Sequence, residues 1–237
     1  MKEKIIIIIP TFNESENISQ MIETLENDIF PKIDRYNMNI LIVDDYSNDG
    51  TAEIVKRKML KYNNIMINQD KKKGLGEAFK RGIKFAIDKM DAGAIIKMDA
   101  DFQHNPIYIL DFIKKYTEGN DYIIGSRFIK GGKVPRNWSL FRKLLSKYGG
   151  LLTRSILFFP RIDTVKDVSS GFKLINVKNV LNKIDLSKIS DGFCYTTEIM
   201  YKALNIGIKI TETPIEFELR EKGETKMPFS NILTTLR

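Results

Sequence analysis

The sequence is poor in the residues that form disulfides and zinc sites. Its 237 residues include one cysteine, Cys194, and one histidine, His104. A single cysteine excludes an intramolecular disulfide and is typical of a reducing compartment. One Cys and one His are too few for a zinc site that needs several such ligands. A metal ion in this protein must therefore be held mainly by oxygen atoms, which favours magnesium or manganese.

Long apolar runs are missing as well. No stretch reaches the roughly 18–20 uninterrupted apolar residues of a membrane-spanning helix. The nearest stretch, residues 148–160, contains Arg154 and two glycines. The first apolar run, residues 5–9, is too short for a signal peptide and ends at Pro10. We therefore expect a protein that is soluble or peripheral on a membrane.

Acidic residues are absent from one segment. Residues 122–162 contain nine lysines and arginines but no aspartate or glutamate. The whole chain has 38 basic and 30 acidic residues, a net charge of +8, so the remainder holds 29 basic and 30 acidic residues. This segment carries the entire excess, which indicates an anionic partner such as a nucleotide, a nucleic acid or a membrane surface.

The same segment has the pattern of an amphipathic helix. Apolar and aromatic residues recur every three or four positions from Trp138 to Phe159, and basic residues fall roughly on the opposite face. The pattern fits either an ordinary surface helix or a helix on an anionic membrane with its arginines near a lipid phosphate. A nucleic-acid surface is less favoured. The residues predicted to meet membrane or acceptor are Arg136, Trp138, Arg142, Lys143 and Lys147.

Strand and helix patterns alternate along the first half of the chain. Short β-branched runs at residues 5–9, 40–43, 65–67, 94–98 and 122–124 predict strands, and apolar periodicity predicts helices over 18–29, 54–62 and 75–90. Further strands are predicted at 169–175, 206–210 and 215–219, with a helix at 196–204. This order predicts an α/β fold with a mostly parallel central sheet flanked by helices.

Polar clusters follow three of the predicted strands: residues 11–14, Asp44-Asp45 and Asp99-Ala100-Asp101. Ligands of such sheets bind beyond the carboxyl ends of the strands, so these clusters predict one crevice. Asp99 and Asp101 would point to the same side and could hold a hard divalent cation with a diphosphate, and Gln103 could add a neutral oxygen. Two solvated loop aspartates are the alternative. No Gly-rich dinucleotide motif follows the first strand.

The motifs, taken together, resemble those of family-2 glycosyltransferases. The matching segments run in order over nearly the whole chain: residues 8–14 (IIPTFNE), 43–47 (VDDYS), 73–78 (KGLGEA), 98–104 (MDADFQH), 125–128 (GSRF), 170–174 (SGFKL) and 220–226. Within that family the chain is similar to dolichol-phosphate mannose synthases and related polyprenyl-phosphate glycosyltransferases. Phe12 stands where the family usually has tyrosine, which keeps an aromatic face.

The resemblance implies a GT-A fold and a set of site residues. Asp99, Asp101 and Gln103 would hold Mg²⁺ or Mn²⁺ on the donor diphosphate. Arg127, Arg220 and Lys226 would face phosphate groups of donor or acceptor and, with Asp101, form the catalytic set. The residues that would bind the nucleotide sugar are Pro10, Phe12, Glu14, Val43, Asp45, Asp99, Ala100 and Asp101.

The resemblance further implies a single GT-A domain over residues 1–237. Residues 1–128 would bind the nucleotide sugar, and 129–237 would face the acceptor and membrane. The implied activity is that of an inverting hexosyltransferase moving mannose from GDP-mannose to a polyprenyl phosphate such as dolichyl phosphate. It would act on the cytoplasmic face of a membrane, alone or with a separate membrane-anchor subunit, and without nucleic acid.

Three alternatives remain open: a UDP-glucose-dependent polyprenyl-phosphate glucosyltransferase, a transferase to a glycan hydroxyl, and an inactive membrane adaptor. A hydroxyl acceptor needs a general base, whereas a phosphate monoester, with a second pKa of about 6, does not. His104, Asp191 and Glu198 are the candidate bases. The favoured interpretation is that Asp191 begins a helix and Glu198 lies on its polar side.

Overall fold

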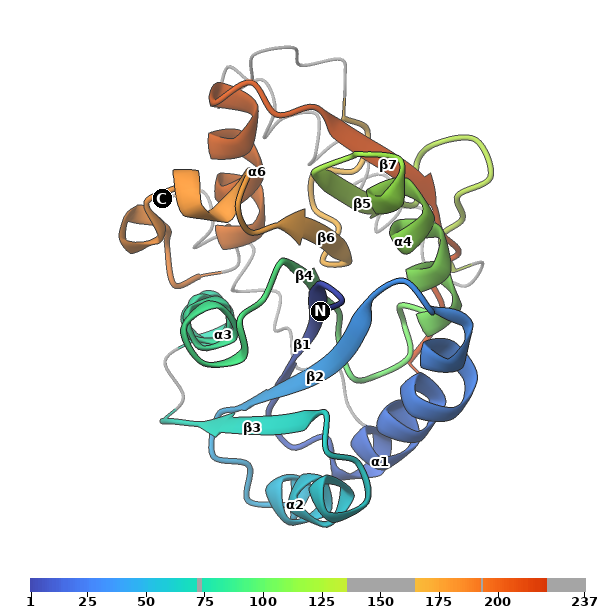
Figure 1. The fold of residues 1–237 in the computed structure, drawn as a ribbon, viewed down its shortest axis with the longest axis vertical. Coiled ribbons are helices and arrows are strands. Elements are labelled where there is room, and N and C mark those ends of the chain that lie inside the picture. Colours follow the sequence, from blue (N-terminus) through green and yellow to red (C-terminus); the bar gives the residue numbers. More distant parts are fainter. Residues whose placement is uncertain (72–73, 136–164, 193, 221–237) are drawn as a thin grey trace.

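A computed structural model describes residues 1–71, 74–135, 165–192 and 194–220. Its centre is a seven-stranded sheet in the order β3-β2-β1-β4-β6-β5-β7 (Figure 1). The strands are β1 (Lys4–Thr11), β2 (Asn37–Asp44), β3 (Ile65–Gln69), β4 (Ala94–Lys97), β5 (Tyr122–Ser126), β6 (Lys173–Asn176) and β7 (Ile210–Pro214). The α/β fold predicted from the sequence is confirmed.

The sheet is parallel except around one strand. β1 pairs in parallel with β2 and β4, β2 with β3, and β5 with β7, whereas β6 runs antiparallel between β4 and β5. β1 lies between two strands, and its five consecutive isoleucines, residues 5–9, are fully buried. A run of β-branched residues suits such a strand because both of its faces meet helices.

Helices cover both faces of the sheet (Figure 1). One face carries α1 (Ser15–Thr24), which continues as a π-helical turn over Leu25–Ile29, together with α2 (Thr51–Lys61) and α4 (Ile109–Thr117). The other face carries α3 (Leu75–Met90) and α6 (Tyr195–Asn205). Short 3-10 turns lie at Phe30–Lys32, Pro106–Tyr108, Leu181–Lys183 and Leu186–Lys188. No helix within the described ranges is long and apolar enough to cross a membrane.

The second half of the chain departs from four sequence predictions. The strands predicted at 206–210 and 215–219 are wrong, because β7 occupies Ile210–Pro214 and residues 215–219 hold only isolated bridges at Glu216 and Phe217. Gly207 has a φ of +83°, which belongs to the turn that ends α6 rather than to a strand. The strand predicted at 169–175 begins only at Lys173. Asp191 does not begin a helix, since α6 starts at Tyr195.

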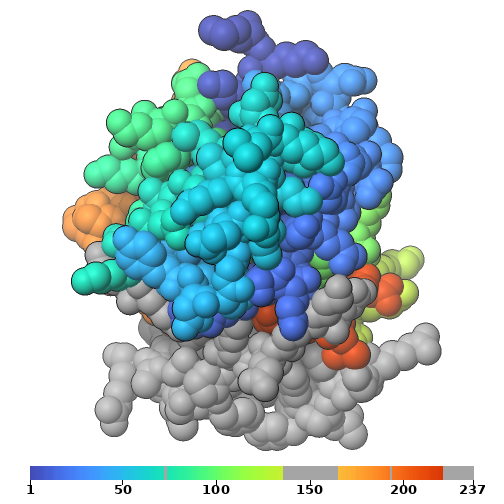
Figure 2. Space-filling view, turned by 90° about the horizontal axis from the view of Figure 1, so that it is seen from below, coloured from blue at the N-terminus to red at the C-terminus, as the bar shows by residue number. Residues whose placement is uncertain are grey.

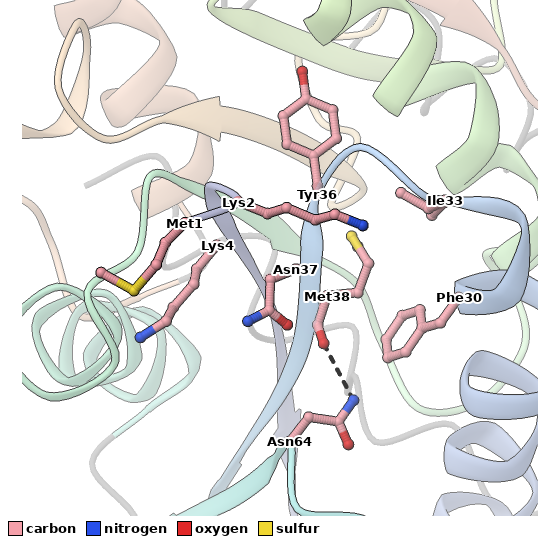
Figure 3. Close-up of a pocket in the computed structure, with 9 residues that line it drawn as sticks. All are labelled: Met1, Lys2, Lys4, Phe30, Ile33, Tyr36, Asn37, Met38 and Asn64. Atoms are coloured by element: carbon pink, nitrogen blue, oxygen red, sulfur yellow. Dashed lines mark hydrogen bonds between the residues drawn. The ribbon is translucent and has the colours of Figure 1, made fainter.

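An open hollow of about 410 Å³ lies at the amino ends of β1 and β2 (Figure 3). This is the edge of the sheet opposite to the strand ends that carry the acidic clusters. No residue predicted for the functional site lines it; the lining residues are Met1, Lys2, Lys4, Phe30, Ile33, Tyr36, Asn37, Met38 and Asn64. The candidate site must therefore be sought at the carboxyl ends of the strands.

Candidate functional site

The loops after β1, β2 and β4 share an unusual backbone feature. Asn13, Tyr46 and Phe102 have φ values of 55°, 49° and 61°, in the left-handed region that residues other than glycine seldom adopt. Of the four such residues in the described chain, these three follow neighbouring strands of the sheet. Strained backbone concentrates at functional sites, so this edge of the sheet is the first candidate.

Asp99 and Asp101 follow β4 directly and occupy different surroundings. Asp99 keeps 40% of its side chain exposed, and its Oδ1 lies 3.0 Å from the ammonium group of Lys97. The Asp101 side chain is only 10% exposed. Its Oδ1 accepts a hydrogen bond from the Gln103 backbone at 3.2 Å, and its Oδ2 lies 3.5 Å from Nη1 of Arg220. The two carboxylates therefore stand one residue apart, each facing a basic side chain.

Burial and neighbouring charges shift the pKa values of these two carboxyl groups in opposite directions. Burial, reinforced by the charge of Asp99, raises the pKa of Asp101 to about 6. Burial also opposes ionisation of Asp99, but the adjacent Lys97 outweighs it and holds the pKa of Asp99 below its ordinary value. Burial alone would lower the pKa of Lys97, but the charge of Asp99 outweighs it and raises that pKa above its ordinary value. Asp99 is thus the more firmly ionised member of the pair.

Glu14 and Arg220 join the two ends of the described chain at this site. Nη2 of Arg220 donates to both carboxylate oxygens of Glu14, at 2.6 and 2.7 Å, and both side chains are nearly buried. Asn17 also donates to Glu14, at 2.9 Å. In Figure 2 red residues from the end of the described chain lie beside blue residues from its first part, in agreement with these contacts. Three predicted residues, Glu14, Asp101 and Arg220, therefore meet.

Asp44, the last residue of β2, and Asp45, the residue after it, have different partners. Asp44 is fully buried and accepts hydrogen bonds from Thr11, Ser47 and Gln69, so it fixes the loop. Asp45, predicted to bind the nucleotide, pairs with Arg81 of α3 at 3.0 Å. Burial raises the pKa of Asp45, and Arg81 opposes that shift.

Two of the four apolar residues predicted for the nucleotide pocket, Val43 and Ala100, are too deeply buried for their side chains to line it. Pro10 and Val43 are register partners on β1 and β2. The Val43 side chain is fully buried and belongs to the core beneath α3, while Ala100 is 3% exposed. Pro10 and Phe12 remain half-buried. Val43 and Ala100 would therefore contact a ligand through the backbone.

Arg127 follows β5 and is held by a carboxylate that the sequence pattern did not reveal. Its Nε and Nη2 donate to the two oxygens of Asp167 at 2.7 and 2.8 Å, a bidentate pair. The Asp167 side chain is fully buried, and its backbone N–H donates to Glu212 of β7. Arg127 keeps the pKa of Asp167 below its ordinary value in spite of burial.

The Gly-Leu-Gly sequence at residues 74–76 is explained by packing. A Cβ on Gly76 would lie 2.7 Å from the carbonyl oxygen of Ser190, and one on Gly74 would lie 2.8 Å from that of Asp191. The Gly76 N–H donates to the Asp191 carbonyl at 3.0 Å. The two glycines therefore allow the loop before α6 to lie directly on the start of α3.

The candidate bases are engaged in structural contacts. The Asp191 carboxylate pairs with Lys80 at 2.6 Å, and Glu198 accepts a hydrogen bond from the Ser190 backbone at 2.9 Å. His104 is 4% exposed, and its ring contacts those of Phe172 and Phe217. Burial lowers the pKa of His104 to about 4, so the imidazole is neutral at pH 7. Each of these three side chains therefore has a partner within the fold.

The oxygen atoms around Asp99 and Asp101 suit a hard divalent cation. No group of three or more His, Cys, Asp or Glu side chains poised for a metal occurs in the described part of the chain. Two carboxylates and the Gln103 amide would supply part of a coordination shell, and a diphosphate would supply the rest. The Gln103 amide nitrogen donates to the Glu218 carbonyl at 3.3 Å, which anchors this side chain.

The remaining predicted site residues lie outside the described ranges. They are Lys226 and the membrane or acceptor residues Arg136, Trp138, Arg142, Lys143 and Lys147. Conversely, sequence reasoning missed Lys97, Arg81 and Asp167, each of which holds a site residue. Only the position of Lys97 in an otherwise apolar strand, two residues before Asp99, could have drawn attention to it.

A known protein family matches most of the chain. The model of the glycosyl transferase family 2 matches residues 6–180. The chain belongs to glycosyl transferase family 2. A dolichol-phosphate mannosyltransferase of Pyrococcus furiosus is 37% identical over 99% of this chain and 62% of its own length. A polyprenol monophosphomannose synthase of Mycolicibacterium smegmatis is 33% identical over 97% of this chain and 83% of its own length.

Solved structures of GT-A glycosyltransferases share the architecture of this chain. Glucosyl-3-phosphoglycerate synthase of Mycobacterium tuberculosis, in complex with Mn²⁺ and UDP, aligns with a TM-score of 0.67 at 13% identity, over 94% of this chain and 73% of that one. Mannosyl-3-phosphoglycerate synthase of Rubrobacter xylanophilus aligns with a TM-score of 0.67 at 15% identity, over 92% and 68%. The predicted GT-A fold is confirmed.

Proposed function

We propose that this protein is an inverting glycosyltransferase that moves mannose from GDP-mannose to a polyprenyl phosphate. The observation that carries the proposal is the meeting of Glu14, Asp101 and Arg220 beside Asp99 at the carboxyl ends of the strands. The two curated relatives, which are named for mannosyl transfer to dolichol phosphate and polyprenol phosphate, support the sugar and the acceptor class.

The donor would bind across the loops after β1, β2 and β4. Asp99, Asp101 and Gln103 would hold Mg²⁺ or Mn²⁺, which would neutralise the diphosphate as it leaves. Glu14 and Asp45 would meet the nucleoside from the loops after β1 and β2. Arg220, next to Asp101, would add a fixed positive charge where negative charge develops on the leaving GDP.

Transfer would be a single displacement. A phosphate oxygen of the lipid attacks C1 of mannose from the face opposite to GDP and forms the new C1–O bond. The bond between C1 and the β-phosphate oxygen breaks, and its electron pair leaves with GDP. A phosphate monoester is mostly dianionic at neutral pH, so no protein group needs to remove a proton. The engagement of Asp191 and Glu198 in structural contacts fits this route.

The test is a transfer assay with labelled donor. Labelled GDP-mannose and a short polyprenyl phosphate should give a product that extracts into organic solvent, and Asp101→Ala should abolish it. Turnover with UDP-glucose alone would contradict the mannose assignment. Extension of a soluble glycan only would contradict the lipid-phosphate acceptor. Absence of turnover with every donor would favour the inactive adaptor.

The acid-free segment would bring the protein to the cytoplasmic face of a membrane. Its basic residues, Arg136, Arg142, Lys143 and Lys147, would meet anionic headgroups. Changing these four residues to Glu should weaken binding to liposomes containing anionic lipid, with the effect largest at low salt because surface charges are screened by ions. The wild type on neutral liposomes is the control. Unchanged binding of the variant would refute this membrane contact.

A further inference from the structure

Lys97 is the last residue of β4 and is 3% exposed. It lies on the face of the sheet that α3 and α6 cover, since it is two residues beyond Ile95, which belongs to that core. Burying an ammonium group in such a place is costly unless a partner of opposite charge accompanies it. The partner is Asp99, whose Oδ1 lies 3.0 Å from the Lys97 nitrogen.

A second buried lysine provides a direct comparison. Lys173 of β6 is the register partner of Lys97 across the β4–β6 pair and is 2% exposed. Its ammonium nitrogen donates to the backbone carbonyl of Thr196 at 3.0 Å. The two lysines are thus register partners with similar burial on the same face of the sheet, but it is Lys97 whose ammonium group pairs with Asp99.

The ion pair is enclosed on one side. A Cβ on Gly171 would lie 3.0 Å from the Lys97 nitrogen and 3.7 Å from Oδ2 of Asp99. Nδ1 of His104 lies 3.6 Å from the same Asp99 oxygen. Glycine at 171 therefore leaves space for the pair, and Asp99 is fixed from the protein side while 40% of it faces solvent.

Charge at the site is nearly balanced before any ligand binds. Among the described side chains at this point of the site, Glu14, Asp99 and Asp101 carry negative charges, and Lys97 and Arg220 lie within 3.5 Å of them. A divalent cation alone would meet a weakly negative site, whereas a nucleoside diphosphate brings further negative charge and oxygen ligands.

We propose that Lys97 is a positioning residue for Asp99 whose charge makes divalent-cation binding depend on the nucleoside diphosphate. The inference rests on the proposed function, because it concerns the cation and donor of that site. Lys97 holds one oxygen of Asp99 and cancels its charge, so the cation binds well only with the diphosphate. Asp99 is then already oriented when the complex arrives.

The experiment measures Mn²⁺ binding by the electron paramagnetic resonance signal of free Mn²⁺, with and without GDP. Wild-type protein should bind Mn²⁺ at least about tenfold more tightly when GDP is present. Lys97→Met should strengthen Mn²⁺ binding without GDP by about tenfold, because a nearby positive charge is removed. Lys173→Met, the matched control, should leave Mn²⁺ binding unchanged. Loss of a structural contact alone would not tighten cation binding.

Two results would overturn the inference. One is equal Mn²⁺ affinity of the wild type with and without the nucleotide, which needs no variant. The other is a folded Lys97→Met protein whose Mn²⁺ affinity is unchanged or weaker. In the transfer assay Lys97→Met should lower kcat by about 10–100-fold because Asp99 is no longer fixed. If UDP rather than GDP supports binding, the donor assignment fails, and the same comparison with UDP decides the role of Lys97.

Discussion

Three carboxylates at the candidate site each face a basic side chain, which comes from the preceding strand end for Asp99 and from a distant stretch of sequence for the other two. Asp99 faces Lys97, Asp45 faces Arg81, and Glu14 faces Arg220. Buried ion pairs of this kind seldom raise stability over an apolar core, yet removing one partner is costly. Their clustering at one edge of the sheet is therefore better explained by binding than by folding.

Asp101 is expected to reduce stability at neutral pH. Its pKa is raised to about 6, above the ordinary 3.8, so between these values the native state holds a proton that the unfolded state has lost. The cost of ionising Asp101 in the fold therefore grows as pH rises to about 6 and then stays constant. Asp101→Asn should be more stable than the wild type at pH 7 in urea unfolding, and the gain should vanish near pH 4. An equal gain at both pH values would contradict this account.

At the scale of elements, ion pairs and close backbone contacts hold loops to strands and helices. Arg127 at the end of β5 binds Asp167, and Asp167 in turn receives support from Glu212 of β7. The loop before α6 rests on the glycines that begin α3, and Lys80 pairs with Asp191 across the same contact. The segments that carry Arg127, Asp191 and Glu198 are thereby fixed relative to the sheet.

The Arg127–Asp167 pair should contribute far more to the free energy of unfolding than an exposed ion pair does. Asp167→Ala leaves a nearly buried guanidinium without its bidentate partner, so we expect a loss of about 3–5 kcal/mol in the free energy of unfolding. The matched control is Glu216→Ala, which breaks the Lys133–Glu216 pair whose side chains are 64% and 51% exposed. That change should cost less than about 1 kcal/mol. Similar losses for both variants in urea unfolding would refute the distinction.

Gly76 should tolerate no side chain. Its Cβ would lie 2.7 Å from the Ser190 carbonyl oxygen and 2.8 Å from that of Asp191, both backbone atoms that cannot turn away. Gly76→Ala should therefore displace the loop and destabilise the fold by about 1–3 kcal/mol, measured by thermal unfolding. Gly192→Ala is the control, since its Cβ would meet no described atom within 4 Å. If Gly76→Ala left the thermal stability unchanged, the loop before α6 would not be held against Gly76.

At the scale of the whole molecule, the sequence predicted what depends on local pattern. The β-branched run at residues 5–9 and the apolar periodicity of 75–90 correspond to β1 and α3. The antiparallel insertion of β6 between β4 and β5 was not predictable, because strand direction depends on where the chain returns. The ion pairs of Lys97 and Asp167 were equally hidden, since they follow from strand register and loop packing. The sequence therefore revealed the motif residues of the site but not the side chains that hold them in place.

Ligand binding should stabilise the whole fold, since the site joins the loops after β1, β2 and β4 to Arg220 near the end of the described chain. A ligand at 100 times its Kd adds about 2.7 kcal/mol to the free energy of unfolding. For a chain of 237 residues this raises Tm by about 5–10 °C. Scanning calorimetry with Mn²⁺ and GDP should show that rise, and chelation of the metal or Asp101→Asn should remove most of it. A larger rise with UDP than with GDP would instead assign a uridine donor, and no rise with either nucleotide would contradict a nucleotide site at this edge of the sheet.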